Sequence, residues 1–220
     1  EVVSSTYASL NSQGDAAYTL PLGSGPNVTV RATLMGPSWE VWDWSAASPA
    51  PPFAIHPSAP VPTNQSGVDF EFFPTATEYE ISQLNIMHRL ADTWLYYKNH
   101  IYHDNLVPGL DETILAYANV NALCRAQYEY HVAAGEWVLW YARAGYCAAC
   151  PPTARWCPNT GYSSVVSHEY AHHILYTAGG VTPLLSQHSA FHEGYADTVA
   201  HLLYDTPLIG ENFSNEDHPS

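Results

Sequence analysis

The sequence is poor in basic residues. Its 220 residues include six lysines and arginines, of which Lys98 is the one lysine, against 21 acidic residues, so the formal net charge is −15. A surface with this charge repels phosphate backbones and anionic lipids and attracts divalent cations. We therefore expect neither nucleic acid nor a membrane surface as a partner.

Long apolar runs are also missing. No segment approaches the roughly 18 uncharged apolar residues of a membrane span, and no N-terminal stretch joins basic residues to an apolar run as a signal peptide does. The chain starts at Glu1 without Met, which we interpret as a mature, processed N-terminus. With 46% apolar residues, the composition is that of a globular protein with one large or two small domains.

Cysteines are few, and the four that are present allow three pairings. The pairing that we favour joins Cys124 to Cys147 across a hairpin and Cys150 to Cys157 around a short loop. The rival interpretation is a metal site on the Cys147-x-x-Cys150 spacing. The sequence has no second CxxC or nearby His pair at a suitable distance to complete such a site, so we expect disulfides.

Three Asn-x-Ser/Thr sequons begin at Asn27, Asn64 and Asn212, and each is a potential glycosylation site. Together with paired cysteines, they favour export into an oxidising compartment. We therefore expect a secreted or extracellular glycoprotein.

The N-terminal part is rich in strand and turn signals. Residues 1–46 alternate apolar and polar side chains in short runs between Gly and Pro. Residues 47–63 are rich in proline, which predicts a linker or an extended surface loop, and residues 68–73 predict a further strand. We divide the chain into a β-rich region with a proline-rich linker over residues 1–66 and a second region over residues 67–220.

The first helix is expected to begin near Thr77, because Thr77 and Glu80 have the spacing of a capping box. Apolar positions then follow at steps of three and four, which predicts one buried stripe. A His on such a stripe is more often a hydrogen-bonded core residue than a ligand. The stripe comprises Ile81, Leu84, His88, Ala91 and Leu95.

A strand and a hairpin should follow this helix. Residues 107–117 predict a loop that leads into a strand. Residues 119–132 and 136–146 are β-rich runs on either side of a small-residue turn, which predicts a hairpin centred near Gly135.

Residues 164–178 predict a helix that a Gly-Gly pair ends. Positions four apart share a helix face, so His168 and His172 can bind one ion, at about 2.0–2.1 Å each for zinc. Glu169 lies one step round the helix, near the ion but not bound to it. This is the H-E-x-x-H arrangement, in which the glutamate serves as the general base.

A zinc hydrolase needs a third protein ligand and leaves the fourth position for water. Residues 189–204 predict a second helix, in which Glu193 follows His172 by 21 residues and Asp197 follows Glu193 by four. Glu193 can serve as the carboxylate ligand. Asp197 can accept the ring N–H of a ligand histidine, which completes a site of two histidines and one glutamate.

The H-E-x-x-H motif, followed about twenty residues later by E-x-x-x-D, resembles the gluzincin metallopeptidases of the thermolysin-like and fungalysin-like families. Residues 94–106 are similar to the long helix of that fold, residues 119–123 to its edge strand and residues 176–180 to the turn after the active-site helix. The resemblance covers about residues 75–205. It implies an α+β fold, in which a thermolysin-like mixed sheet is joined by long helices that carry the two motifs.

Roles for five residues follow from the resemblance. It implies that His168, His172 and Glu193 ligate one zinc ion, with Glu169 as the general base of a peptidase. It also implies that Asp197 orients His168.

The resemblance further implies that the substrate backbone pairs with the edge strand, which would put Asn121 and Ala122 in the binding cleft. The family often binds calcium, to which the acidic segment at residues 210–220 could contribute, although no calcium shell can be placed.

The sequence departs from the gluzincin pattern after the zinc motifs. The family supplies an oxyanion donor from a Tyr soon after the helix and from a His in a following helical subdomain. Residues 180–185 lack that Tyr, and the chain ends 27 residues after Glu193, so we expect the C-terminal helical subdomain to be missing. His173, Tyr176 and His188 are nearby candidates for the donor.

The leading functional hypothesis is a secreted zinc endopeptidase that acts on peptides or proteins. An alternative is a structural or adhesive extracellular protein that retains a gluzincin-like zinc site without turnover. A third is one piece of a cleaved precursor, in which a companion chain completes the cleft.

Overall fold

The computed structural model describes the greater part of the chain from residue 77 onward and shorter pieces before it. The described residues are 27–28, 31–32, 34–45, 56–57, 60–62, 77–101, 110, 112–133, 135–150, 154–179, 186–206 and 208–209. The strand expected at residues 68–73 and the acidic segment at residues 210–220 lie outside them.

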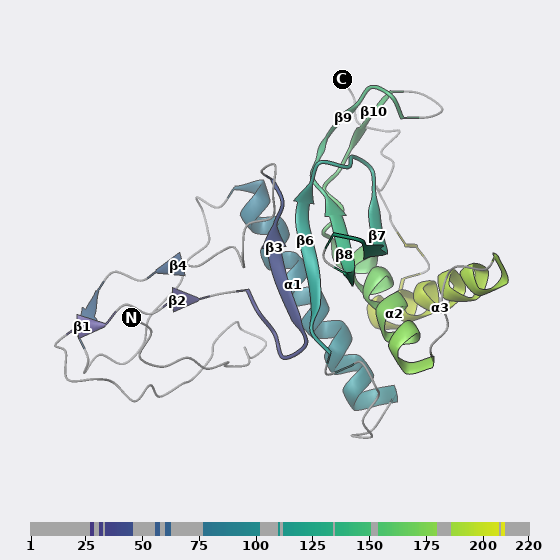
Figure 1. The fold of residues 1–220 in the computed structure, drawn as a ribbon, viewed down its shortest axis with the longest axis horizontal. Coiled ribbons are helices and arrows are strands. Elements are labelled where there is room, and N and C mark those ends of the chain that lie inside the picture. The colour runs from purple at the N-terminus through teal and green to yellow at the C-terminus, as the bar shows by residue number, and fades with distance from the viewer. Residues whose placement is uncertain are drawn as a thin grey trace.

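A four-stranded mixed sheet forms the centre of the protein (Figure 1). Its strands lie in the order β3, β6, β8, β7, and β3 and β8 each run parallel to β6 while β7 runs antiparallel to β8. With the helices described below, this sheet gives the α+β class expected from the sequence. The strands are β3 (Trp39–Asp43), β6 (Ile114–Val120), β7 (Ala126–His131) and β8 (Glu136–Ala142).

Three long helices accompany the sheet, as the sequence predicted. In Figure 1, α1 crosses behind β3 and β6, α2 packs beneath β7 and β8, and α3 lies against α2. A π-helical turn, η1, extends α1. The bounds are α1 (Glu78–Tyr96), η1 (Tyr97–Ile101), α2 (Ser163–Gly179) and α3 (Ser186–Tyr204).

Shorter strands complete the described structure. β1 pairs with β5, β2 with β4, and β9 with β10, all antiparallel. β4 and β5 fall in the proline-rich segment 47–63, so part of that segment is paired backbone rather than linker. β3 precedes residue 66 but pairs with β6 in the central sheet. The sheet therefore includes a strand from each side of the division expected at residue 66. The bounds are β1 (Asn27–Val28), β2 (Arg31–Ala32), β4 (His56–Pro57), β5 (Val61–Pro62), β9 (Gly145–Cys147) and β10 (Arg155–Cys157).

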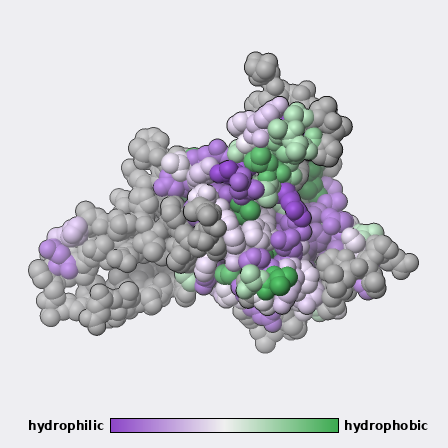
Figure 2. All heavy atoms as spheres, turned by 45° about the horizontal axis from the view of Figure 1, so that its top comes forward, coloured by the Kyte–Doolittle hydropathy of each residue, from purple (hydrophilic) through white to green (hydrophobic). Residues whose placement is uncertain are grey.

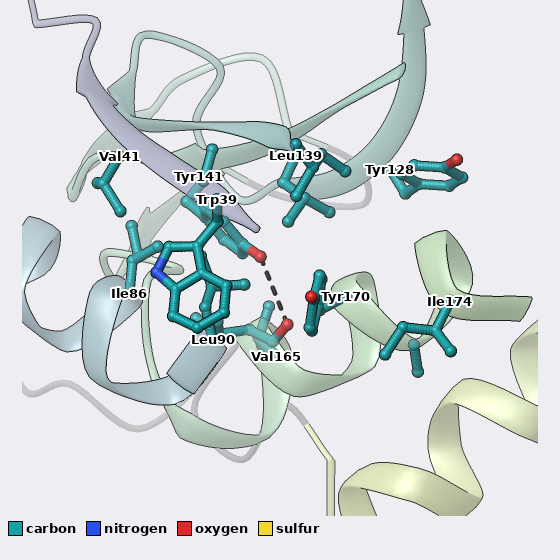
Figure 3. Close-up of a cluster of buried hydrophobic side chains, with 14 of the residues drawn as sticks. Trp39, Val41, Ile86, Leu90, Tyr128, Leu139, Tyr141, Val165, Tyr170 and Ile174 are labelled. Atoms are coloured by element: carbon teal, nitrogen blue, oxygen red, sulfur yellow. Dashed lines mark hydrogen bonds between the residues drawn. The ribbon is translucent and has the colours of Figure 1, made fainter. Parts of the chain in front are cut away.

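The main hydrophobic core lies between the sheet and helices α1 and α2 (Figure 3). Trp39 of β3 contacts Trp94 and Tyr170 edge-on, with ring centroids 6.1 and 6.4 Å apart. Edge-to-face pairs of this kind add about 0.5–1.5 kcal/mol each to the area that they bury. The core therefore fixes α1 and α2 to the same face of the sheet.

The start of α1 matches its expected capping box. The Thr77 side chain accepts a hydrogen bond from the backbone N–H of Glu80, and the Glu80 carboxylate accepts one from the N–H of Thr77. The apolar stripe expected along α1 is wrong, because Ile81 is 39% and Leu95 47% exposed and the His88 side chain lies largely in solvent. The face that α1 buries carries Ser82, Gln83, Ile86, Leu90 and Thr93.

Polar partners on neighbouring elements explain this choice of face. The Ser82 hydroxyl donates to the Asn159 side chain at 2.9 Å, and the Thr93 hydroxyl lies 2.7 Å from that of Ser167. A buried hydroxyl with a partner avoids the desolvation cost of an unpaired one. α1 therefore turns these two polar residues inward, and a pattern of apolar residues alone could not predict that.

The β7–β8 hairpin forms as expected, with Gly135 at a positive φ of 74° in its turn. Its register differs from the expected one, because His131 pairs with Glu136 and Ala126 with Tyr141. Continuing that ladder would set residue 124 opposite residue 143 rather than opposite residue 147.

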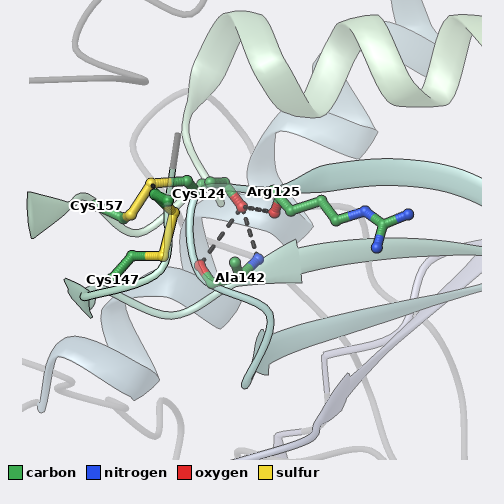
Figure 4. Close-up of a disulfide and its surroundings, with 7 residues drawn as sticks. Cys124, Arg125, Ala142, Cys147 and Cys157 are labelled. Atoms are coloured by element: carbon green, nitrogen blue, oxygen red, sulfur yellow. Dashed lines mark hydrogen bonds between the residues drawn. A yellow bond between two sulfur atoms is a disulfide. The ribbon is translucent and has the colours of Figure 1, made fainter. Parts of the chain in front are cut away.

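The disulfides consequently differ from those that we favoured. The structure joins Cys124 to Cys157 and Cys147 to Cys150. β10 runs back antiparallel to β9, which follows the hairpin, and this return brings Cys157 to Cys124 just before β7 (Figure 4). Cys147 and Cys150 then form a local pair within the β9–β10 connection.

The Cys124–Cys157 bond joins the residues just before β7 to the segment that leads into α2. Beside it, the Arg125 carbonyl accepts hydrogen bonds from the Ala142 N–H and the Thr160 hydroxyl (Figure 4). A disulfide across 33 residues stabilises the folded state by about 3–4 kcal/mol through the entropy of the unfolded chain.

The surface of the described part is mixed. Figure 2 shows hydrophilic residues over much of one face, with hydrophobic atoms in a few separate groups. Among the described helices, none is both long enough and apolar enough to span a bilayer.

Replacing Leu90 and Leu95 separately by alanine tests the orientation of α1. Leu90 is fully buried and Leu95 is 47% exposed, so L90A should lower the free energy of unfolding by about 2–5 kcal/mol and L95A by less than about 1 kcal/mol. Urea denaturation of both variants measures the difference. A larger loss for L95A would mean that the helix buries the opposite face.

Candidate metal centre

Helices α2 and α3 pack against each other and bring the two sequence motifs together. His168 and His172 lie one turn apart on α2, and the distance between their Nε2 atoms is 3.1 Å. Glu193 of α3 places one carboxylate oxygen 3.2 Å from the Nε2 of His168 and the other 3.7 Å from the Nε2 of His172. Two imidazoles and one carboxylate from two helices therefore converge on one point.

The donor set fits a zinc ion. For a tetrahedral ion with bonds of about 2.0–2.1 Å, neighbouring ligand atoms should lie about 3.3 Å apart. The three observed separations, 3.1, 3.2 and 3.7 Å, lie close to that value. Two imidazoles and one carboxylate also suit zinc in chemical type, so His168, His172 and Glu193 could hold the ion.

A further contact orients each histidine. The Nδ1 of His168 lies 2.9 Å from a carboxylate oxygen of Asp197. The Nδ1 of His172 lies 3.3 Å from the Nδ1 of His192, which is 1% exposed. If its Nε2 bound a metal ion, His172 would carry its proton on Nδ1, and His192 would accept the hydrogen bond.

Sequence reasoning missed His192. It directly precedes Glu193, and no spacing rule assigns a role to that position. The available signal was its place on the predicted helix, next to the ligand, where packing against α2 would bring it close to a ligand histidine.

The two imidazoles differ in their electrostatics. Burial and the neighbouring His168 lower the pKa of His172 to about 4, so His172 is neutral and able to bind a metal at pH 7. Burial alone would lower the pKa of His168, but its hydrogen bond to Glu193 and the nearby carboxylates raise it above its ordinary value. The same hydrogen bond lowers the pKa of Glu193.

Glu169 is buried beside the three donors, between α2 and the edge strand. Burial raises its pKa to about 7 against the opposing effect of His168. The backbone N–H of Tyr128 on β7 donates a hydrogen bond to its carboxylate. A carboxylate whose pKa lies near neutrality can both take up and release a proton at physiological pH.

A set of hydroxyl contacts holds the two helices in place. The hydroxyl of Ser167, the residue before His168, lies 2.7 Å from that of Thr93 on α1 and 2.9 Å from that of Tyr204 on α3. Tyr97 of η1 donates to the hydroxyl of Tyr195 on α3 at 2.9 Å. These contacts fix the rotation of α2 and α3 about their axes.

The turn into α2 depends on a glycine. A Cβ on Gly161 would lie 2.7 Å from the Ser82 hydroxyl and 2.9 Å from Ile86 of α1. Such contacts are too close for a larger residue, so α1 and the start of α2 can approach in this way only with glycine at that position.

Asn121 and Ala122 do not lie on an edge strand. They follow β6, which has β3 on one side and β8 on the other. The described strand at the edge beside α2 is β7, the first strand of the hairpin. The edge-strand assignment for residues 119–123 is therefore wrong, because β7 takes that place.

The candidates for an oxyanion donor differ in their surroundings. His188 is exposed on the first turn of α3. His173 is buried and stacks on Tyr170 with ring centroids 5.8 Å apart. Tyr176 is partly buried against Trp137. The acidic segment considered for calcium lies outside the described residues.

Comparison of the sequence with protein-family models and with curated proteins finds no match.

Removing the partner of His172 should weaken metal binding. His192→Phe deletes the acceptor for the His172 Nδ1–H, and partners of this kind are worth about 10–100-fold in metal affinity. His192→Asn keeps an acceptor oxygen and should retain most of the affinity. Competition with a chromophoric chelator measures the zinc dissociation constants.

His188→Phe is the matched control, because His188 is exposed on the same helix and should leave zinc affinity unchanged. Wild-type affinity in His192→Phe would show that His192 does not orient His172. Thermal unfolding of the metal-free variants establishes that each one folds.

Glu169 should make the stability of the metal-free protein depend on pH. Its pKa is about 7 in the folded chain against 4.5 in the unfolded one, so the folded state binds its proton more tightly. As pH rises from 4.5 through 7, wild-type stability should fall relative to that of Glu169→Gln, by about 3 kcal/mol once Glu169 is fully ionised.

Urea denaturation of both chelator-treated proteins between about pH 4 and pH 8 measures this difference. Below pH 4.5 the protonated carboxyl and the amide should give similar stabilities. A difference that does not change with pH would contradict the raised pKa.

Proposed function

We propose that the protein is a secreted zinc-dependent endopeptidase of the gluzincin type. The observation that carries the proposal is the convergence of the Nε2 atoms of His168 and His172 and the carboxylate of Glu193 within 3.1–3.7 Å of one another. Asp197 beside one ligand and the buried Glu169 beside the cluster add the orienting partner and the general base that peptide hydrolysis needs.

The architecture supports the gluzincin type. A mixed sheet ends in an antiparallel strand beside the first motif helix, and the second motif helix packs against the first. Two disulfides support secretion, because disulfides persist in oxidising compartments.

A zinc ion bound by His168, His172 and Glu193 would polarise a peptide carbonyl and lower the pKa of water. Glu169 takes the proton of the attacking water on its carboxylate and delivers it to the leaving amine. In the metal-free chain, burial raises the pKa of Glu169 to about 7, which favours its uptake of a proton. Asp197 and His192 lie 2.9 and 3.3 Å from the Nδ1 atoms of His168 and His172, where they would favour the tautomers that leave Nε2 free for the ion.

Among the described strands, none pairs with the outer edge of β7, and this edge offers a backbone surface for the substrate. In an antiparallel ladder, successive residues point their N–H and C=O groups alternately toward the partner and away from it. The Arg125 carbonyl bonds to the neighbouring strand, whereas the Tyr128 N–H reaches Glu169. Ala126 and Tyr130 therefore present their backbone groups at the same free edge as Tyr128, where an extended peptide can pair.

The decisive experiment compares wild type with Glu169→Gln on quenched-fluorescence peptides at pH 7. The wild type should hydrolyse peptides and lose this activity in chelator. Glu169→Gln should retain one zinc ion per chain by elemental analysis while kcat falls by about 10²–10⁴-fold or more, because the proton acceptor is gone. Glu193→Gln should lose zinc as well as activity.

Hydrolysis by Glu169→Gln at the wild-type rate would show that the assigned base is wrong. Bound zinc without hydrolysis of any peptide or of casein by the wild type would instead support a non-catalytic extracellular protein. Native mass spectrometry of the purified material shows whether a companion chain co-purifies.

A further inference from the structure

Four aromatic side chains beside the candidate metal centre form a continuous surface, which we term the aromatic shelf: Tyr128 and Tyr130 of β7, Trp137 of β8 and Tyr176 of α2. Trp137 stacks on Tyr128 with centroids 4.8 Å apart and lies 5.7 Å from Tyr130 and 4.9 Å from Tyr176. These contacts link all four rings.

The shelf begins at the metal centre. The Tyr128 ring lies parallel to the ring of His172, with centroids 6.5 Å apart and an angle of 13° between the planes. Figure 3 shows Tyr128 on the helix side of the sheet, above α2. From there the rings continue toward the C-terminal end of β7, which is the strand that a substrate would pair with.

The shelf is open to solvent at its far end. Tyr128 is buried, Trp137 and Tyr176 are partly buried, and Tyr130 is 49% exposed. Trp137 directly opposes Tyr130 in the ladder and contacts its ring edge-on, so it supports the Tyr130 ring from the β8 side. A large aromatic side chain is therefore held in place while about half of it remains accessible.

The strand geometry places a substrate side chain on this open end. Residues directly opposite each other on neighbouring strands point to the same face. A peptide paired with β7 therefore puts one side chain beside Tyr130 on the face that the shelf occupies. Tyr128 marks the reaction centre through its bond to Glu169, and Tyr130 lies two residues, or about 6.8 Å, further along.

We propose that the aromatic shelf is a substrate subsite that selects an aromatic or large apolar side chain two residues from the residue at the scissile bond. This inference rests on the proposed peptidase function. The edge of Tyr130 and the stacked Trp137 behind it offer the offset and edge-to-face contacts that aromatic rings prefer. A small or charged side chain at that position would leave the shelf in contact with water.

The test uses zinc-loaded Glu169→Gln, so that peptides bind without being consumed. A fluorescent host peptide of about ten small residues carries a single Phe that is moved through every position, and anisotropy gives each affinity. One Phe position should bind about three- to tenfold more tightly than the all-small host, as expected for one or two aromatic contacts. Tyr130→Ala should reduce that advantage to less than about twofold.

Two variants serve as controls. Tyr130→Phe keeps the ring and should keep the preference. Tyr146→Ala removes a tyrosine that is 62% exposed on β9 and should also keep it. An affinity that does not depend on the position of Phe, or a preference that survives in Tyr130→Ala, would overturn the subsite.

The failure of the proposed function would be seen separately. In that case zinc-loaded wild type would cleave none of the peptides, whatever the position of Phe, while the binding measurements on Glu169→Gln would still report whether the shelf selects an aromatic side chain.

Discussion

The packing of α2 against α3 is the constraint on which the site depends. Each helix alone presents an incomplete set, with two imidazoles on one and a carboxylate on the other. Their contact brings the two Nε2 atoms and the carboxylate oxygens of Glu193 to separations of 3.1–3.7 Å. Ser167 lies one residue before the first ligand, and its hydroxyl contacts those of Thr93 and Tyr204. These contacts hold the helices in this arrangement. A small rotation of either helix would separate the donors, so the packing between the helices controls the geometry of the candidate metal centre.

The sequence predicted the parts of this arrangement that depend on local periodicity. A spacing of four on a helix places His168 and His172 on one face, and caps and glycines mark the helix ends. The hairpin was also predictable from its composition and turn. By contrast, its register was not, because small residues in the turn permit more than one pairing, and that difference changed which cysteines meet.

Other features depend on partners that are distant in sequence. Ser82 and Thr93 turn inward on α1 because they meet Asn159 and Ser167, which no apolar pattern can reveal. His192 has a role only once α3 lies against α2. The edge position of β7 depends on the order of the strands in the sheet. β8 follows β7 in the sequence but lies between β6 and β7 in the sheet, which leaves β7 at the edge. These features connect the metal centre to the strand that would hold a peptide.

Anomalous diffraction at the zinc absorption edge, from crystals of the zinc-loaded protein, tests the central claim most directly. The account predicts one strong peak at about 2.0–2.2 Å from the Nε2 atoms of His168 and His172 and from the Glu193 carboxylate. A peak coordinated elsewhere, or no peak at these three side chains, would contradict it.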